Sequence, residues 1–166
     1  MIAIIVFFAW TWFGPRGGPP EGLQAPILVG DLLDGGEFDL DDAVGAVTVI
    51  DFWATWCGPC IRSLPALQQL HERYADDSSV RILSVNIDDG PKLKRRIGAF
   101  MAERDYDFPV IIDFGKRISR AYRVQTIPTM VVVNTEGIVH KVRVGLPSSD
   151  PKRIIKHVIA TVNAAR

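Results

Sequence analysis

Two segments of the chain, 47–53 and 80–87, are rich in apolar residues and show no clear alternation. A strand inside a parallel sheet is covered by helices on both faces, so it loses the apolar–polar alternation of a half-exposed strand. The pattern therefore predicts two buried central strands. Further strands are expected over 110–113, 130–134 and 138–144, the last two joined as a hairpin by a turn over 134–137.

Helical spacing of apolar residues appears between and after these strands. In the segment 91–103, Ile97, Phe100 and Met101 recur at i, i+3 and i+4, which predicts one apolar helix face. Other helices are expected over 61–74, over 116–122 and from Pro151 onward, the last one capped by Ser149 or Asp150. Strands that alternate with helices predict an α/β fold, with a central mixed β-sheet flanked by helices on both faces.

The first 26 residues differ from the domain expected over 27–166. Residues 1–13 contain an almost unbroken apolar run, shorter than the roughly 20 residues that a membrane-spanning helix needs. Residues 14–26 hold four glycines and four prolines, which is typical of a linker. We expect 1–13 to be a membrane anchor or signal segment whose start is truncated or mis-assigned. A segment that packs on another surface and a short intact signal peptide are the alternatives.

The charge composition narrows the choice of partners. The chain has 19 Lys and Arg residues and 19 Asp and Glu residues, so its formal net charge is zero. Nucleic-acid binding relies on a basic surface that neutralises phosphates. The one basic run, 92–96, fits the solvated face of a helix. We therefore expect no nucleic-acid partner. The length of 166 residues and the hydrophobic content of 48% predict one globular domain, which we expect to be a monomer.

The two cysteines of the chain, Cys57 and Cys60, are separated by Gly58 and Pro59 and lie between a predicted strand and a predicted helix. A helix N-terminus carries a charge of roughly +0.5 and unpaired N–H groups, and both favour a thiolate. Cys57 is expected at the exposed end and is the predicted nucleophile. Cys60, one turn further in, is the predicted resolving thiol. This context is typical of thiol–disulfide chemistry.

Three other interpretations of the cysteine pair are weaker. A zinc site needs about four ligands, and the chain offers two cysteines and three scattered histidines, so we expect no metal. A purely structural disulfide that closes so short a loop gains little entropy. A scaffold that has lost its activity would have little reason to keep both sulfurs.

The run Asp51-Phe-Trp-Ala-Thr-Trp-Cys-Gly-Pro-Cys60 resembles the motif of the thioredoxin superfamily. A second hallmark, Thr126-Ile-Pro-Thr129, follows about 70 residues after the first cysteine. Residues 38–45 and the added helix 91–103 are similar to the N-terminal addition and the insertion of the TlpA/ResA-like membrane-anchored thiol–disulfide oxidoreductases. The resemblance implies a thioredoxin-like fold in which Pro128 follows a cis peptide bond and faces the cysteines.

The resemblance also implies which acid handles the proton of Cys60. Thioredoxins have an aspartate at the position of Asp51, and burial raises the pKa of such a carboxyl so that it can accept a proton near neutral pH. Many TlpA/ResA-like proteins have asparagine there and use a glutamate at the start of the insertion, a position matched here by Asp89. Asp51 is the predicted acid. Asp89 is a possible second acid, or else a residue of the turn over 88–91.

The family resemblance implies a reductant of protein disulfides that needs no cofactor. Trp56, Gly58, Pro59 and Ile127 would contact the substrate protein, which could be apocytochrome c or a copper-site protein. A membrane partner would supply electrons on the periplasmic or extracytoplasmic face of a bacterial cell envelope. A partner-binding or chaperone module with a thioredoxin-like fold and a peroxide-reducing redoxin are the alternatives.

Overall fold

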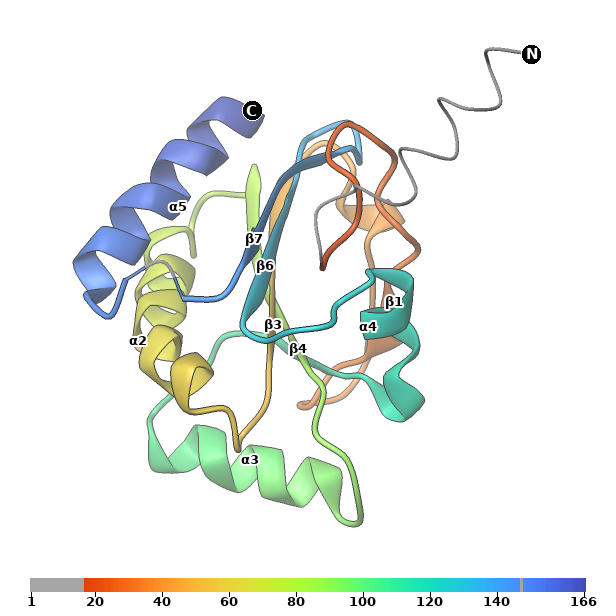
Figure 1. The fold of residues 1–166 in the computed structure, drawn as a ribbon, viewed down its shortest axis with the longest axis vertical. Helices are drawn as coiled ribbons and strands as arrows, with labels where there is room; N and C mark the ends of the chain where they lie inside the picture. The colour runs from red at the N-terminus through yellow and green to blue at the C-terminus, as the bar shows by residue number, and fades with distance from the viewer. Residues whose placement is uncertain (1–16, 147) are drawn as a thin grey trace.

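A five-stranded mixed sheet forms the centre of the protein in a computed structural model that describes residues 17–146 and 148–166 (Figure 1). The strand order is β5-β4-β3-β6-β7, with β3, β4 and β5 parallel and with β6 and β7 antiparallel to their neighbours. The strands are β3 (Val47–Trp53), β4 (Val80–Asn86), β5 (Val110–Ile112), β6 (Thr129–Val133) and β7 (Val139–Val144). All seven residues of β3 are buried, as expected for a central strand. The predicted α/β fold is confirmed.

Helices cover both faces of this sheet. The helices are α2 (Gly58–Arg73), α3 (Leu93–Glu103), α4 (Arg117–Ala121) and α5 (Pro151–Ala165). In Figure 1, α2 and α5 lie on one side of the sheet and α4 lies on the other. Apolar residues of α2, α3 and α5 form one core with Trp53, and Ile118 of α4 forms a second core with Phe52 and Tyr122. Asp150 caps α5 by accepting a hydrogen bond from the Lys152 N–H at 3.0 Å.

Two helices begin later than their sequence patterns predict. Lys92 adopts a left-handed backbone conformation with φ 58°, so α3 begins at Leu93 and not at Pro91. Lys116 has the same conformation, and α4 begins after it, preceded by the short 3-10 turn η2 (Phe114–Lys116). A left-handed residue interrupts the helical hydrogen-bond ladder. Both starts therefore depend on turn geometry that apolar spacing does not reveal.

Residues 17–26, within the segment predicted as a linker, run along the sheet at β7. The Gly22 N–H donates to the Val139 carbonyl at 2.8 Å, and the Val139 N–H donates back to the Leu23 carbonyl at 2.8 Å. The Tyr122 hydroxyl donates to the Pro26 carbonyl at 2.9 Å. These contacts attach residues 17–26 to the domain that begins after them.

A two-stranded antiparallel hairpin precedes the central sheet. It consists of β1 (Val29–Asp31) and β2 (Glu37–Asp39), and a 3-10 turn, η1 (Asp41–Ala43), leads from it to β3. Across residues 17–146 and 148–166, no helix combines the length and the apolar character needed to cross a membrane. The predicted anchor over 1–13 lies outside the described residues.

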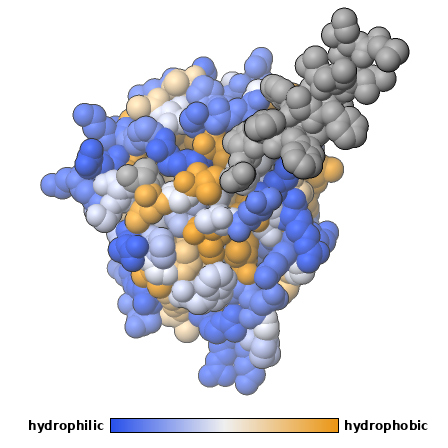
Figure 2. All heavy atoms as spheres, viewed as in Figure 1, coloured by the Kyte–Doolittle hydropathy of each residue, from blue (hydrophilic) through white to orange (hydrophobic). Residues whose placement is uncertain are grey.

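The described surface is largely polar. In the view of Figure 2, hydrophilic residues dominate the rim and hydrophobic residues gather toward the middle. Within residues 17–146 and 148–166, the exposed large apolar side chains are Leu23, Ile27, Val44, Trp56, Phe114 and Val144. Of these, Trp56 alone is adjacent in sequence to a cysteine.

Candidate functional site

Cys57 and Cys60 form a disulfide at the N-terminus of α2, with their Cα atoms 5.2 Å apart. Cys57 is the N-cap residue, and its Sγ accepts a hydrogen bond from the Cys60 N–H at 3.2 Å. Pro59 sits in the first turn, where its missing N–H costs no helical hydrogen bond. Once the disulfide is reduced, the same N–H and the helix macrodipole would stabilise a thiolate on Cys57.

The loop before β6 lies against this disulfide. Ile127 and Pro128 are joined by a cis peptide bond, as the sequence resemblance implies. The Ile127 carbonyl oxygen is 3.8 Å from the Cys57 Sγ, although the two residues are 70 positions apart. On the solvent side, Trp56 is 67% exposed, whereas both cysteines are buried. A partner that reaches Cys57 would therefore meet Trp56 and Ile127 beside it.

Asp51 is a buried carboxyl on β3, only 3% exposed. Its Oδ2 has no hydrogen-bond partner among the described residues. Because burial disfavours the charged form, the pKa of Asp51 is raised to about 7. Asp51 thus has the proton affinity of an acid–base group that works near neutral pH.

Asp51 lines a small cavity. It has a volume of about 20 Å³, and its lining includes Asp51, Ser63 and Pro128. Ser63 lies one turn beyond Cys60 and donates to the Cys60 carbonyl at 2.8 Å. A cavity of this size is large enough for one water molecule, although most of its lining residues are apolar. One water could therefore relay a proton between Asp51 and its surroundings.

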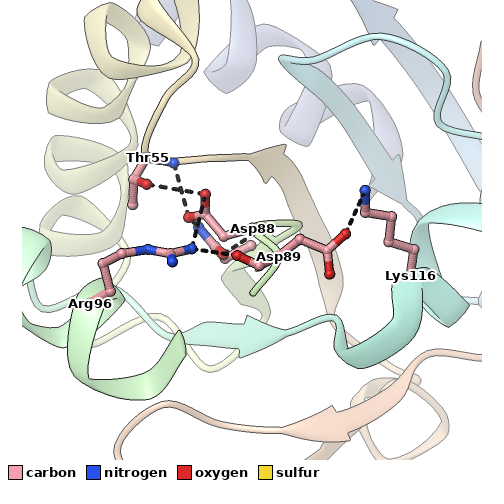
Figure 3. A network of polar contacts seen from close by, with 6 residues as sticks. Thr55, Asp88, Asp89, Arg96 and Lys116 are labelled. Atoms are coloured by element: carbon pink, nitrogen blue, oxygen red, sulfur yellow. Dashed lines mark hydrogen bonds and ion pairs between the residues drawn. The ribbon is translucent and has the colours of Figure 1, made fainter. Parts of the chain in front are cut away.

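The structure separates the two acids of the turn after β4. Asp89, the possible second acid, has a side chain that is 74% exposed and a carboxylate 3.0 Å from the Lys116 Nζ. Asp88 is buried, and its carboxylate accepts hydrogen bonds from the Thr55 N–H and the Thr55 hydroxyl, both at 3.1 Å (Figure 3). The burial of Asp88 could not be predicted from the sequence, because nothing in the polar run 88–91 indicates which acidic side chain points inward.

Possible metal ligands are scattered in the described part of the chain. Within residues 17–146 and 148–166, no group of three or more His, Cys, Asp or Glu side chains could hold a metal ion. A dithiol that can close into a disulfide can pass two electrons to another disulfide through a mixed-disulfide intermediate.

Comparison with known proteins gives consistent matches over most of the chain. The AhpC/TSA family model matches residues 22–142. The chain is 32% identical to the thioredoxin-like protein YneN of Bacillus subtilis, covering 87% of this chain and 86% of that protein. It is 30% identical to the thiol-disulfide oxidoreductase ResA of Halalkalibacterium halodurans, covering 87% of this chain and 80% of that protein. A solved structure from Chlorobium tepidum, assigned as the thiol:disulfide interchange protein DsbE, shares 28% identity and a TM-score of 0.73, over 86% of this chain and 97% of that one.

Proposed function

The chain belongs to the AhpC/TSA family, among the thioredoxin-like thiol–disulfide oxidoreductases, and from this premise we propose that it reduces disulfides of other proteins. The observation that carries the proposal is the Cys57–Cys60 disulfide at the N-terminus of α2, against the Ile127–Pro128 loop. Gly58 and Pro59 place the two cysteines three residues apart at the start of α2, with their Cα atoms 5.2 Å apart, so that their sulfurs can bond.

The proposed reaction has two exchange steps. The Cys57 thiolate attacks one sulfur of the substrate disulfide, so that a mixed disulfide forms and the first substrate thiolate leaves. The Cys60 thiol then loses its proton, and its sulfur attacks the Cys57 Sγ. This releases the second substrate thiolate and closes the Cys57–Cys60 disulfide, the form that the structure contains. The substrate gains the two electrons that the dithiol loses.

Asp51 is the proposed acceptor of the Cys60 proton. Its pKa of about 7 allows it to be ionised at mildly alkaline pH and still to hold a proton afterwards. Asp51 shares its cavity with Ser63, whose hydroxyl donates to the Cys60 carbonyl at 2.8 Å and so places Asp51 close to the Cys60 segment of α2. Asp89 is less suited to this role, because its carboxylate pairs with Lys116 at the surface.

We also propose that the protein works on the periplasmic or extracytoplasmic face of a bacterial membrane. The apolar run 2–13 supports attachment there, and a membrane protein would return electrons to the oxidised Cys57–Cys60 pair. Apocytochrome c and copper-site proteins are the substrates that the resemblance to the TlpA/ResA-like proteins suggests. Trp56 and Ile127 would contact them beside Cys57.

A measured reduction potential tests the proposed direction of electron flow. We expect the Cys57–Cys60 couple, equilibrated with glutathione or thioredoxin buffers, to have a potential closer to the roughly −270 mV of thioredoxin than to the roughly −120 mV of DsbA. A value near that of DsbA would identify an oxidant. A pair that does not exchange with these buffers would favour the alternative of a partner-binding module.

Trp56 provides a prediction about substrate binding. We expect Trp56→Ala to raise KM for a protein disulfide about tenfold and to leave kcat nearly unchanged, because an exposed tryptophan beside a reactive group supplies contact area and no chemistry. Leu23→Ala is the matched control, since Leu23 is also exposed but lies by Val139 at the opposite end of the sheet. Steady-state kinetics with an insulin-like substrate would show whether KM changes while kcat does not. Equal effects of the two changes would remove Trp56 from the binding surface.

A further inference from the structure

A buried carboxylate holds the turn that leads to the nucleophile. Asp88 accepts two hydrogen bonds from Thr55, which is two residues before Cys57, and a third from the Asn86 amide at 3.0 Å. The Cys57 N–H closes the same turn by donating to the Ala54 carbonyl at 3.1 Å. Asp88 therefore holds the backbone at Thr55, directly before Trp56 and Cys57.

Among the described residues, Asp88 forms an ion pair only with Arg96, which lies on the inserted helix α3. The Arg96 Nη2 lies 3.8 Å from the Asp88 Oδ1 and donates to the Asp89 carbonyl at 2.8 Å (Figure 3). The Arg96 side chain is 43% exposed, whereas that of Asp88 is fully buried. Arg96 thus reaches from the surface of α3 to the buried network and can be changed without opening a core.

The signs of these charges affect the thiolate. A buried negative charge near Cys57 disfavours a second negative charge on its sulfur, and a nearby positive charge offsets that repulsion. Other charged groups in this part of the protein include Arg62 near Gly58 and the paired Asp89 and Lys116, while Asp51 shares a cavity with Arg143 and His157. Among the described residues, none of these groups is hydrogen-bonded to Thr55, so Asp88 and Arg96 are the charged pair linked directly to the turn before Cys57.

We propose that Arg96 is a positioning residue that neutralises Asp88 and thereby sets the reactivity of Cys57. The inference rests on the proposed function, because it assigns the attacking thiol to Cys57. It gives the inserted helix α3 a role in the chemistry: α3 supplies the charge that makes a buried aspartate tolerable beside a thiolate. Removing Arg96 should make the Cys57 thiolate less favourable and the Cys57–Cys60 disulfide harder to reduce.

The test compares Arg96→Met with Arg95→Met, a neighbour on α3 that makes no ion pair among the described residues. The pKa of Cys57 is measured in the reduced protein from the pH dependence of alkylation, with the labelled cysteine identified by mass spectrometry. We expect Arg96→Met to raise this pKa by about half a unit and to shift the glutathione equilibrium about threefold toward the disulfide. Arg95→Met should change neither, and Arg96→Lys should restore part of the effect because it keeps the charge.

A double-variant cycle shows whether Arg96 acts through Asp88. Asp88→Asn keeps an oxygen for Thr55 and removes the charge, so it should lower the pKa of Cys57. In the Asp88→Asn background, Arg96→Met should have little further effect, since independent sites add and coupled sites do not.

Three results would overturn the inference: no shift in Arg96→Met, an equal shift in Arg95→Met, or a full Arg96→Met shift in the Asp88→Asn background. The failure of the proposed function looks different. If the unsubstituted protein is alkylated first at Cys60, the assignment of the nucleophile is wrong, whatever the Arg96 variants show.

Discussion

Cys57→Ser abolishes the reduction of protein disulfides, by at least about a thousandfold, because a serine hydroxyl stays protonated where a thiol at a helix N-terminus ionises. The substitution should remove the thiol without removing the helix cap, because a serine hydroxyl can still accept the hydrogen bond that the Cys57 Sγ receives from the Cys60 N–H. The fold should therefore persist while turnover of an insulin-like substrate is lost.

Cys60→Ser is the control for this loss. It keeps the attacking thiol of Cys57 and removes the resolving one, so multiple turnover stops but a mixed disulfide accumulates. Alkylation of the reduced protein at mildly acidic pH should label Cys57 before Cys60. The reverse order of labelling would contradict the assignment.

Asp51→Asn should slow disulfide reduction on the order of a hundredfold at mildly alkaline pH, because a neutral amide cannot accept the Cys60 proton. The pKa of Asp51 is about 7, so the wild-type advantage should shrink as pH falls through that value and Asp51 becomes protonated. The reduction potential should change much less, since the environment of Cys57 at the helix end is kept. Rates of disulfide reduction measured on both sides of pH 7 should show the wild-type rate approaching the Asp51→Asn rate as the pH falls.

The same substitution should stabilise the fold at high pH. The folded pKa of Asp51, about 7, lies above the unfolded value of about 3.9, so the unfolded chain releases this proton first as pH rises. The resulting penalty is absent below about pH 4, grows between 4 and 7, and reaches about 4 kcal/mol above 7. Urea unfolding of both proteins should give a difference in the free energy of unfolding that increases over this window. A constant difference would mean that Asp51 does not titrate there.

Asp89→Asn is the matched control for the alternative proton route. Asp89 is exposed and paired with Lys116, so its loss should change the rate less than twofold, as surface ion pairs contribute little. If Asp89→Asn slowed turnover strongly and Asp51→Asn did not, the proton would leave through the insertion and the proposed role of Asp51 would be wrong.

The strand and the helix that hold the two cysteines could be predicted, because the apolar pattern and the cysteine spacing both indicate a strand followed by a helix N-terminus. The apolar run 47–53 becomes the central strand β3, and the cysteines follow it at the start of α2 as expected. The burial of Asp51 was also predictable, since it lies within this strand. The cis bond before Pro128 could be expected only from family resemblance, because nothing in Thr126-Ile-Pro-Thr129 alone specifies an isomer.

Features that depend on distant segments could not be predicted. Residues 17–26 look like a linker by composition, yet their backbone pairs with β7 because that edge offers free N–H and C=O groups. Asp88 and Asp89 are adjacent aspartates in one turn. They differ because Asp88 binds Thr55, whereas Asp89 pairs with Lys116, and both partners come from distant parts of the chain. The reach of Arg96 to Asp88 likewise depends on where α3 begins.

The rates of mixed-disulfide formation in Cys57→Ser and Cys60→Ser test the central claim most directly. Each reduced variant is mixed with the same oxidised protein substrate near neutral pH, and the covalent adduct is followed by mass spectrometry. Cys60→Ser should react about tenfold faster or more, because the thiolate of Cys57 is stabilised at the N-cap of α2. Equal rates, or a faster reaction of Cys57→Ser, would contradict the assignment of Cys57 as the nucleophile.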